Sequence, residues 1–235
     1  ALNQVRLPGG DAAAREPWRM ACAWLVESLR EPEPEIPQRL AAEVDPAAWR
    51  TVCRLAGGVL DAPLTTSAGR LFDAVAALCG LRARTSYEGQ AATLLEAISD
   101  PREIAAYPMP MRIDADAMAA SGAPPALLDA RETIAALLAD LERGAEPPRV
   151  AARFHNALAH GVDEACAMAA EQHGLSLVVL SGGVFQNRLL VTRTAEALEG
   201  RGLRVLVPEL LPPNDGGIAY GQANVAAAID ERGRG

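Results

Sequence analysis

Two short apolar runs, each followed by an amphipathic stretch, restrict the fold more than any other feature of this sequence. The runs LSLVVL (175–180) and LRVLVP (203–208) are rich in Leu and Val and bounded by Gly or Pro, which is typical of buried strands. Helical patterns follow them at 187–202 and 214–230. This order predicts parallel pairing, since parallel neighbours need a crossover connection. Two parallel strands alone are not a stable sheet, so we expect further strands elsewhere in the chain or outside it.

Residues 1–174 are dominated by helical periodicity. Apolar side chains recur at helical spacing, and 50% of all residues are apolar, which is enough to bury a core. The helices expected from this periodicity cover 17–29, 46–56, 69–81, 88–98, 125–142 and 148–173. Residues 99–124, rich in Pro, Asp and Met, are expected to have an extended or irregular middle. We therefore predict a helix-dominated α/β protein, with a mainly helical segment over 1–174 and a small parallel βαβα segment over 175–235 of the same domain.

Two loops are expected to meet at the carboxyl ends of the predicted strands, where parallel-sheet proteins bind their ligands. The loop SGGVFQN (181–187) offers a Gly pair, which lets a ligand approach the backbone, and N–H groups at a helix start, which suit a nucleotide. The loop PPNDGG (212–217) offers Asp215, which can bind a divalent cation or a ribose hydroxyl. The alternative is structural: Asn187 and Asn214 cap helices, the glycines form turns, and Asp215 is a favourable charge at a helix start.

A third candidate lies on the helix predicted at 69–81. Gly69 and Asp73 are four residues apart and so lie on the same helix face, and the Gly leaves open space beside the carboxylate for a ribose. The alternative is that Asp73 is a solvent-facing residue of an amphipathic helix.

Charge and composition argue against several partners. The net charge is −8, from 30 acidic and 22 basic residues, and no basic run suited to nucleic acid is present. No apolar stretch approaches the roughly 20 residues of a membrane span. The first residues lack the pattern of a signal peptide. We therefore expect a cytoplasmic protein with no nucleic-acid or membrane partner.

The cysteines and histidines form no metal or redox motif in the sequence. The four cysteines are far apart without a CxxC pair, and the three histidines include no HExxH pattern. We expect the cysteines to be small buried thiols in a reducing compartment.

Six stretches, in order, resemble the C-terminal part of the HypF family of hydrogenase-maturation carbamoyltransferases: LPGGDAAAREPWRMA, TTSAGRLFDAVAALCGL, YEGQAA, FHNALA, LSGGVFQNRLL and LPPNDGGIAYGQA. The resemblance spans nearly the whole chain, and LSGGVFQN and PPNDGGIA are specific in combination. This part of the family is similar to the threonylcarbamoyl transferases of tRNA modification. Both belong to the actin/hexokinase-like (RNase H-like) superfamily, so the resemblance implies part of an actin/hexokinase-like lobe.

The resemblance also implies a carbamoyl transfer in two steps. In the family, an upstream domain makes carbamoyl adenylate from carbamoyl phosphate and ATP. The C-terminal domain binds this adenylate and passes the carbamoyl group to the C-terminal Cys of the partner HypE, for later conversion to a cyanide ligand of nickel–iron hydrogenase. Because HypE supplies the thiolate, no catalytic side chain is expected here.

Position by position, the resemblance assigns a nucleotide site and one metal ligand. The positions that match the site for ATP or carbamoyl adenylate are Gly69, Asp73, Ser181, Gly182, Gly183 and Asn187. Asp215 matches a carboxylate that joins two histidines around a divalent metal, iron or zinc, with Mg²⁺ also compatible. Those histidines lie upstream in the family, and no HHxxH motif occurs here. We therefore expect a piece of the intact protein, inactive without its upstream domains.

Two other interpretations stay open. A carbamoyltransferase of antibiotic biosynthesis or a tRNA-modifying relative would act on another substrate, although a tRNA substrate predicts a basic surface that the charge of −8 opposes. A non-enzymatic docking module would use the helical segment as its surface and the Gly loops as turns. Nucleotide binding distinguishes this module from an enzyme.

Overall fold

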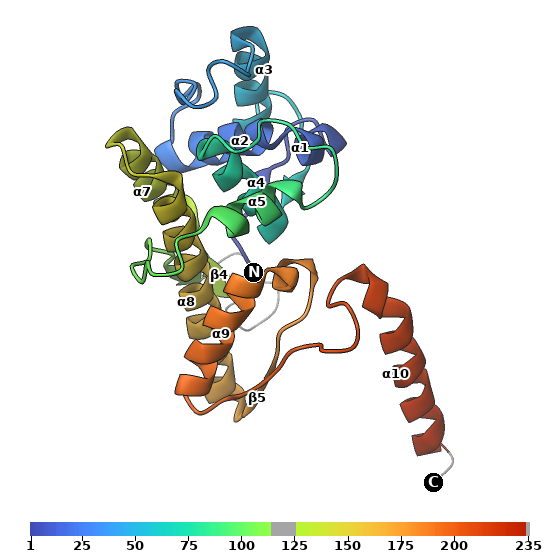
Figure 1. Ribbon diagram of the computed structural model, residues 1–235. Coiled ribbons are helices and arrows are strands. Elements are labelled where there is room, and N and C mark those ends of the chain that lie inside the picture. Colours follow the sequence, from blue (N-terminus) through green and yellow to red (C-terminus); the bar gives the residue numbers. More distant parts are fainter. Residues whose placement is uncertain (114–125, 234–235) are drawn as a thin grey trace. The chain divides into compact units, whose positions relative to one another are not determined.

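The chain divides between Ala165 and Cys166 in the computed structural model, which describes residues 1–113 and 126–233 (Figure 1). The boundary falls within one helix, α8 (Pro147–His173), which begins in the first unit and ends in the second. The other described elements of the first unit are β1 (Val5–Arg6), α1 (Asp11–Arg15), α2 (Pro17–Leu29), α3 (Pro46–Ala56), β2 (Leu64–Thr65), α4 (Ala68–Leu78), α5 (Gln90–Ile98), β3 (Met111–Ile113), β4 (Ala126–Leu128) and α7 (Arg131–Glu142).

The helices of the first unit begin where the sequence supplies caps. The Asp45 carboxylate accepts a hydrogen bond from the Ala48 N–H at 2.8 Å at the start of α3. The Ser67 Oγ accepts one from the Arg70 N–H at 3.4 Å at the start of α4. A Pro opens both α2 and α3, where its missing N–H costs nothing. The helices predicted from the sequence at α2 and α3 are confirmed at both ends.

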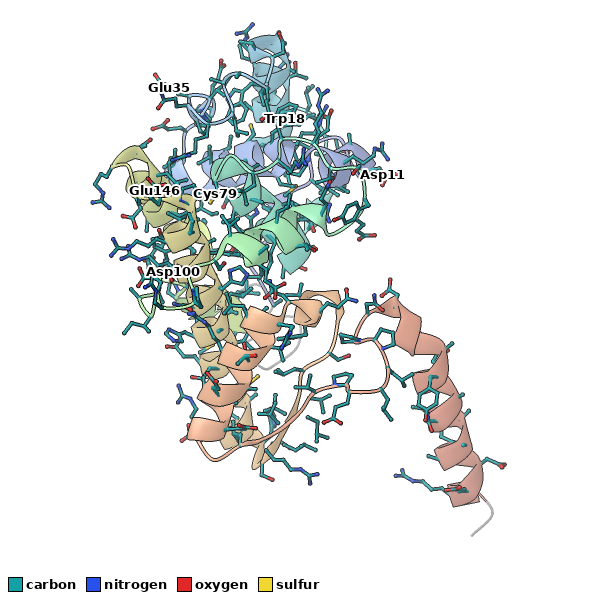
Figure 2. All side chains as sticks on the ribbon, in the orientation of Figure 1. Asp11, Trp18, Glu35, Cys79, Asp100 and Glu146 are labelled. Atoms are coloured by element: carbon teal, nitrogen blue, oxygen red, sulfur yellow. The ribbon has the colours of Figure 1, made fainter. Side chains whose placement is uncertain are left out.

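The core of the first unit is built around α2, which packs against α3, α4 and α7. Side chains from these helices and from α8 fill the interior shown in Figure 2. Phe72 on α4 and Phe154 on α8 meet edge to face with ring centroids 5.0 Å apart, and both side chains are buried. These contacts explain the helical periodicity of the sequence.

Two short antiparallel strand pairs in the first unit were not predicted. β1 pairs with β2, and β3 pairs with β4 in the register Met111↔Leu128. The helix expected over 125–142 is therefore wrong at its start, and α7 begins only at Arg131. Backbone pairing explains the change, because the Leu128 N–H donates to the Ala1 carbonyl at 2.8 Å and its carbonyl accepts from Asn3 at 3.0 Å. Tertiary contacts here override a helix-favouring composition.

The irregular stretch expected over 99–124 is only partly described. It contains β3, and the remainder from 114 to 125 lies outside the described residues. Within the part of the chain that the structure describes, no helix has the length and apolar character needed to cross a membrane.

The second unit contains the predicted parallel βαβα arrangement. Its elements are β5 (Leu177–Val179), the 3-10 turn η1 (Gly183–Gln186), α9 (Arg188–Gly200), β6 (Arg204–Leu206), the 3-10 turn η2 (Asp215–Gly217) and α10 (Ile218–Gly233). β5 and β6 pair in parallel in the register Leu177↔Arg204 and Val179↔Leu206. The two strands form a sheet of their own among the described residues.

Much of the apolar surface of the second unit faces water. Val179 of β5 is 59% exposed and Leu206 of β6 is 40% exposed. Along α10, Tyr220, Val225 and Ile229 are exposed as well. An apolar surface of this kind is typical of a face that packs against further structure.

Candidate functional site

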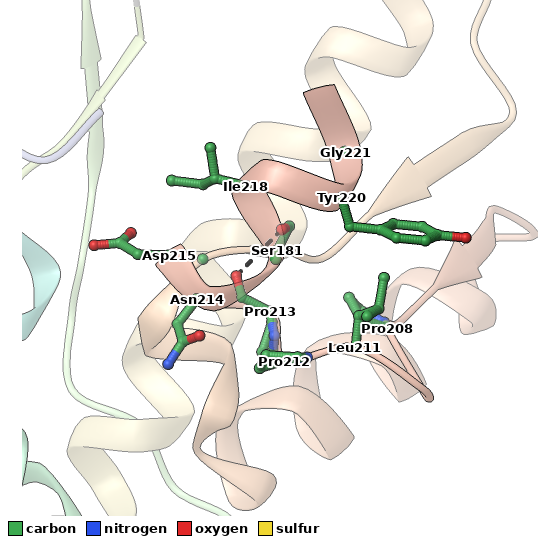
Figure 3. Close-up of a pocket in the computed structure, with 12 residues that line it drawn as sticks. Ser181, Pro208, Leu211, Pro212, Pro213, Asn214, Asp215, Ile218, Tyr220 and Gly221 are labelled. Carbon is green, nitrogen blue, oxygen red and sulfur yellow. Dashed lines mark hydrogen bonds between the residues drawn. The ribbon is translucent and has the colours of Figure 1, made fainter. Parts of the chain in front are cut away.

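The loops that follow β5 and β6 meet, as the sequence predicts. The Gly182 N–H donates to the Pro213 carbonyl oxygen at 2.6 Å, and the Ser181 hydroxyl donates to the same oxygen at 3.4 Å (Figure 3). Both loops leave the carboxyl ends of parallel strands, the position where open α/β sheets bind their ligands. Residues more than 30 positions apart in the sequence are thereby brought to one site.

A pocket of about 430 Å³ opens between these loops and the first turns of α10. Its volume lies within the range of roughly 300–1,000 Å³ usual for small-molecule sites. Pro208, Leu211 and the Tyr220 ring supply apolar surface. Ser181 and Asp215 supply oxygens, and Figure 3 shows the Asp215 carboxylate and the Tyr220 ring extending to opposite sides. The pocket therefore combines an aromatic surface with a few polar groups, as small-molecule sites usually do.

Glycine is required at two positions around this pocket. Gly182 has φ of 105°, a conformation that side chains rarely adopt. A Cβ on Gly217 would lie 2.8 Å from the Pro212 carbonyl oxygen, so the loop could not close. At Gly183, by contrast, a Cβ would meet only the Asn214 Cβ at 3.9 Å, and Gly183 does not line the pocket. The Gly pair of the sequence thus combines one obligatory glycine with one that the local backbone does not need.

The two asparagines of the loops have structural roles, as the alternative interpretation proposed. Asn187 is buried, and its Oδ1 accepts a hydrogen bond from the Leu190 N–H at 2.9 Å, which caps α9. The Asn214 Oδ1 accepts one from the Gly216 N–H at 3.1 Å. A further role of Asn187 in nucleotide binding stays a prediction.

Asp215 is exposed at the start of the turn that leads into α10. A negative charge is favourable there because of the helix dipole. Among residues 1–113 and 126–233, no group of three or more His, Cys, Asp and Glu side chains could hold a metal ion. Zinc sites in proteins normally use at least three protein ligands. The described residues therefore do not make a metal site by themselves, and Asp215 supplies a single carboxylate.

Gly69 and Asp73 belong to α4 in the first unit, whereas the two loops belong to the second. Asp73 is 3% exposed, so the alternative of a solvent-facing residue is wrong. Its Oδ2 lies 2.9 Å from the Arg70 Nη1. Burial raises the pKa of Asp73 to about 6, although Arg70 opposes this effect. A buried carboxylate that is costly to ionise is a common property of functional sites.

The raised pKa of Asp73 predicts how the stability of the first unit depends on pH. The pKa of Asp73 is about 6 in the folded chain and near 3.8 in the unfolded chain. The protonated carboxyl therefore stabilises the fold below pH 4, and this stabilisation is lost as the pH rises through 6. Asp73→Asn, which mimics the protonated acid, should raise the free energy of unfolding at pH 7.5 by about 3 kcal/mol and change it little at pH 4. Urea denaturation followed by tryptophan fluorescence measures this difference.

The control for this prediction is Asp61→Asn, because the Asp61 side chain is fully exposed. It should leave the pH dependence unchanged. A destabilised Asp73→Asn variant at pH 7.5 would show instead that the pair with Arg70 outweighs the burial of the carboxylate.

The chain thus combines a helix-rich first unit with a parallel βαβα unit that carries a pocket at its strand ends. The family described as "Carbamoyltransferase, Kae1-like Domain, second subdomain" matches residues 1–222. The chain belongs to the HypF carbamoyltransferase family. This confirms the resemblance seen in the sequence motifs.

Several HypF proteins are similar to this chain. A carbamoyltransferase HypF homolog of Cupriavidus necator is 40% identical over 96% of the chain, and the HypF of Rhizobium leguminosarum bv. viciae is 36% identical over 97%. The chain spans 56% of the first relative and 28% of the second.

A crystal structure of full-length HypF in the phosphate- and nucleotide-bound form matches the fold with a TM-score of 0.82. That protein is 30% identical to this chain, and the match covers 97% of this chain and 28% of the other. The HypF of T. kodakarensis, at 24% identity and a TM-score of 0.79, has the same fold. The helix-rich α/β fold class expected from the sequence is confirmed.

Proposed function

We propose that this chain is part of the carbamoyl-transfer domain of a cytoplasmic HypF protein. It would bind ATP or carbamoyl adenylate and pass the carbamoyl group to the C-terminal Cys of HypE, for the cyanide ligand of nickel–iron hydrogenase. The observation that carries this proposal is the pocket formed where the loops after β5 and β6 meet, supported by the nucleotide-bound form of a HypF of the same fold. The upstream domains of a longer chain and HypE are the proposed partners.

The described residues suit the positioning part of such a reaction. In the transfer, the HypE thiolate attacks the carbamoyl carbon, a C–S bond forms, the C–O bond to the phosphate breaks, and AMP leaves with the electron pair. Much of the barrier to a transfer between two bound reactants can be removed by holding their reacting atoms close together and correctly oriented. The Tyr220 ring, 58% exposed at the pocket, can stack on a base, and Ser181 can hydrogen-bond to a polar edge. Nucleophile and leaving group both come from the substrates, so this chain needs no catalytic side chain.

Gly69, Asp73, Ser181, Gly182, Gly183 and Asn187 stay the proposed nucleotide-binding residues. Asp215 stays the proposed metal ligand, completed by ligands from outside the described residues. A zinc or iron ion would need further protein ligands beside Asp215, whereas Mg²⁺ could be held by one carboxylate together with substrate phosphates.

The test of this function joins the chain to the upstream part of the Cupriavidus necator HypF2, which is 38% identical to it over 96% of the chain. The chimera is mixed with ATP, carbamoyl phosphate and HypE, and the C-terminal peptide of HypE is examined by mass spectrometry. We expect one carbamoyl group on the terminal thiol. A chimera that hydrolyses ATP but leaves HypE unmodified would contradict the proposed acceptor.

The same chimera tests whether the pocket holds the nucleotide. Gly221 lines the pocket on α10, and an added Cβ there meets no atom within 4 Å. Gly221→Leu should therefore fill part of the pocket without straining the fold, and we expect at least a roughly tenfold weaker affinity for ATP by calorimetry.

The matched control is Gly200→Leu on α9. Gly200 is also helical, an added Cβ there also meets no atom within 4 Å, and Gly200 does not line the pocket. The affinity of the Gly200→Leu chimera for ATP should equal that of the chimera without this substitution. Equal affinities in both variants would place the nucleotide elsewhere and favour the docking interpretation of the loops.

A further inference from the structure

Two of the four cysteines lie in direct contact, although the proposed function uses neither. The Sγ of Cys22 on α2 and the Sγ of Cys53 on α3 are 3.4 Å apart inside the first unit. Both side chains are buried, at 0% and 1% exposure. The two residues are 31 positions apart in the sequence, which is why no spacing motif revealed the pair.

The packing of the two helices holds these sulfurs in register. Trp18 precedes Cys22 by one helical turn, and Trp49 precedes Cys53 by one turn. The two indole rings stack with centroids 6.2 Å apart and an angle of 26° between their planes. The Trp49 Nε1–H donates to the Pro34 carbonyl at 2.8 Å, which fixes that ring. The Trp pair and the Cys pair therefore lie one helical turn apart along the same contact between α2 and α3.

We propose that Cys22 and Cys53 are a reversible redox modification site, at which a hydroperoxide converts the two thiols into one disulfide that links α2 to α3. In the first step one of the two thiolates attacks the peroxide, the O–O bond breaks, and a sulfenic acid and an alcohol or water form. In the second step the other thiol, losing its proton, attacks that sulfur, and water leaves. Two electrons pass from the thiols to the peroxide, and a dithiol reductant reverses the change.

The contact between the sulfurs also affects their ionisation. The hydrogen bond shared with Cys22 holds the pKa of Cys53 below its ordinary value, although burial opposes this effect. The same contact, with burial, raises the pKa of Cys22. Glu33 opposes ionisation of Cys53, and Arg19 favours ionisation of Cys22, but both effects are smaller. Because either sulfur can donate in this contact, either cysteine can be the first nucleophile and the other the resolving thiol.

Access to the pair depends on α3, which is a short helix that buries only Trp49, Val52 and Cys53. A helix attached along one narrow face opens locally more easily than the centre of a core. A hydroperoxide reaches the sulfurs during such openings. Once formed, the disulfide holds α3 on α2 and suppresses the opening that allowed the reaction.

The test treats the 235-residue chain with hydrogen peroxide, quenches it in acid, and blocks the remaining thiols with N-ethylmaleimide in denaturant. Peptide mass spectrometry should find Cys22 joined to Cys53 and both unblocked by the maleimide. The oxidised chain should melt about 5–10 °C higher than the reduced chain, and dithiothreitol should reverse this shift.

Cys79→Ala is the matched control, because Cys79 lies in the same unit and is 2% exposed. This variant should keep the cross-link and the shift, whereas Cys53→Ala should lose both and leave Cys22 open to the maleimide. The wild-type peptide map does not depend on any variant folding. Complete blocking of Cys22 and Cys53 after a treatment that oxidises an exposed reference dithiol would overturn the proposal, as would a link from either to Cys79 or Cys166.

Discussion

The 235-residue chain alone, mixed with ATP, carbamoyl phosphate, divalent metal and HypE, should transfer carbamoyl groups at least about 100-fold more slowly than the chimera that carries upstream domains. Two features of the second unit give the physical reason. The pocket is open, with Tyr220 at 58% and Leu211 at 39% exposure, whereas tight small-molecule sites bury roughly 70–90% of their ligand. Among residues 1–113 and 126–233, Asp215 also has no partner ligands with which it could complete a zinc-type site.

The measurement is the carbamoylated fraction of HypE over time. A circular dichroism spectrum of the chain serves as the control that it is folded. Transfer by the chain alone at a rate near that of the chimera would show that its own residues complete the site.

Phe154→Ala should lower the free energy of unfolding of the first unit by about 3–5 kcal/mol. Phe154 is 0% exposed, and its ring meets Phe72 and the His155 imidazole at centroid distances of 5.0 and 5.9 Å. The truncation leaves a cavity between α4 and α8 and removes an edge-to-face contact. All three tryptophans of the chain lie in the first unit, so their fluorescence in a urea titration reports on this unit alone.

The control for this substitution is Tyr87→Ala, which also removes an aromatic ring but at a position that is 58% exposed. It should change the free energy of unfolding by less than about 0.5 kcal/mol. A loss below about 1 kcal/mol for Phe154→Ala would mean that the neighbouring helices close over the cavity.

The sequence predicted the elements whose periodicity is long or whose ends are marked by caps. α2 and α3 begin with Pro and run to the predicted residues, and the parallel pair β5 and β6 follows from the βαβα order. The short strands were missed because their partners are remote in the sequence. β4 pairs with β3 and contacts Leu2, so nothing within a local window distinguishes it from the helix that follows.

The candidate site could be predicted in outline only. The meeting of the two loops follows from parallel pairing, since both leave the same edge of the sheet. Tyr220 and Leu211 lie within the stretch LPPNDGGIAYGQA but were not predicted as site residues, because an apolar or aromatic side chain gives no local sign that it lines a pocket. The alternative for Asp73 failed because it took the helix as amphipathic, whereas every residue from Leu71 to Leu78 is buried. The contact between Cys22 and Cys53 was missed because it depends on how two separate helices pack.

The exposed strand edges of the second unit also affect how readily copies of the chain aggregate. The two-stranded sheet leaves an edge of β5 and an edge of β6 without a strand partner among the described residues, and such edges are templates for pairing between copies. Repulsion from the net charge of −8 opposes this association. Salt screens that repulsion over about 10 Å at 0.1 M. Ionic strength, as much as the fold, therefore sets the concentration at which the chain stays dispersed.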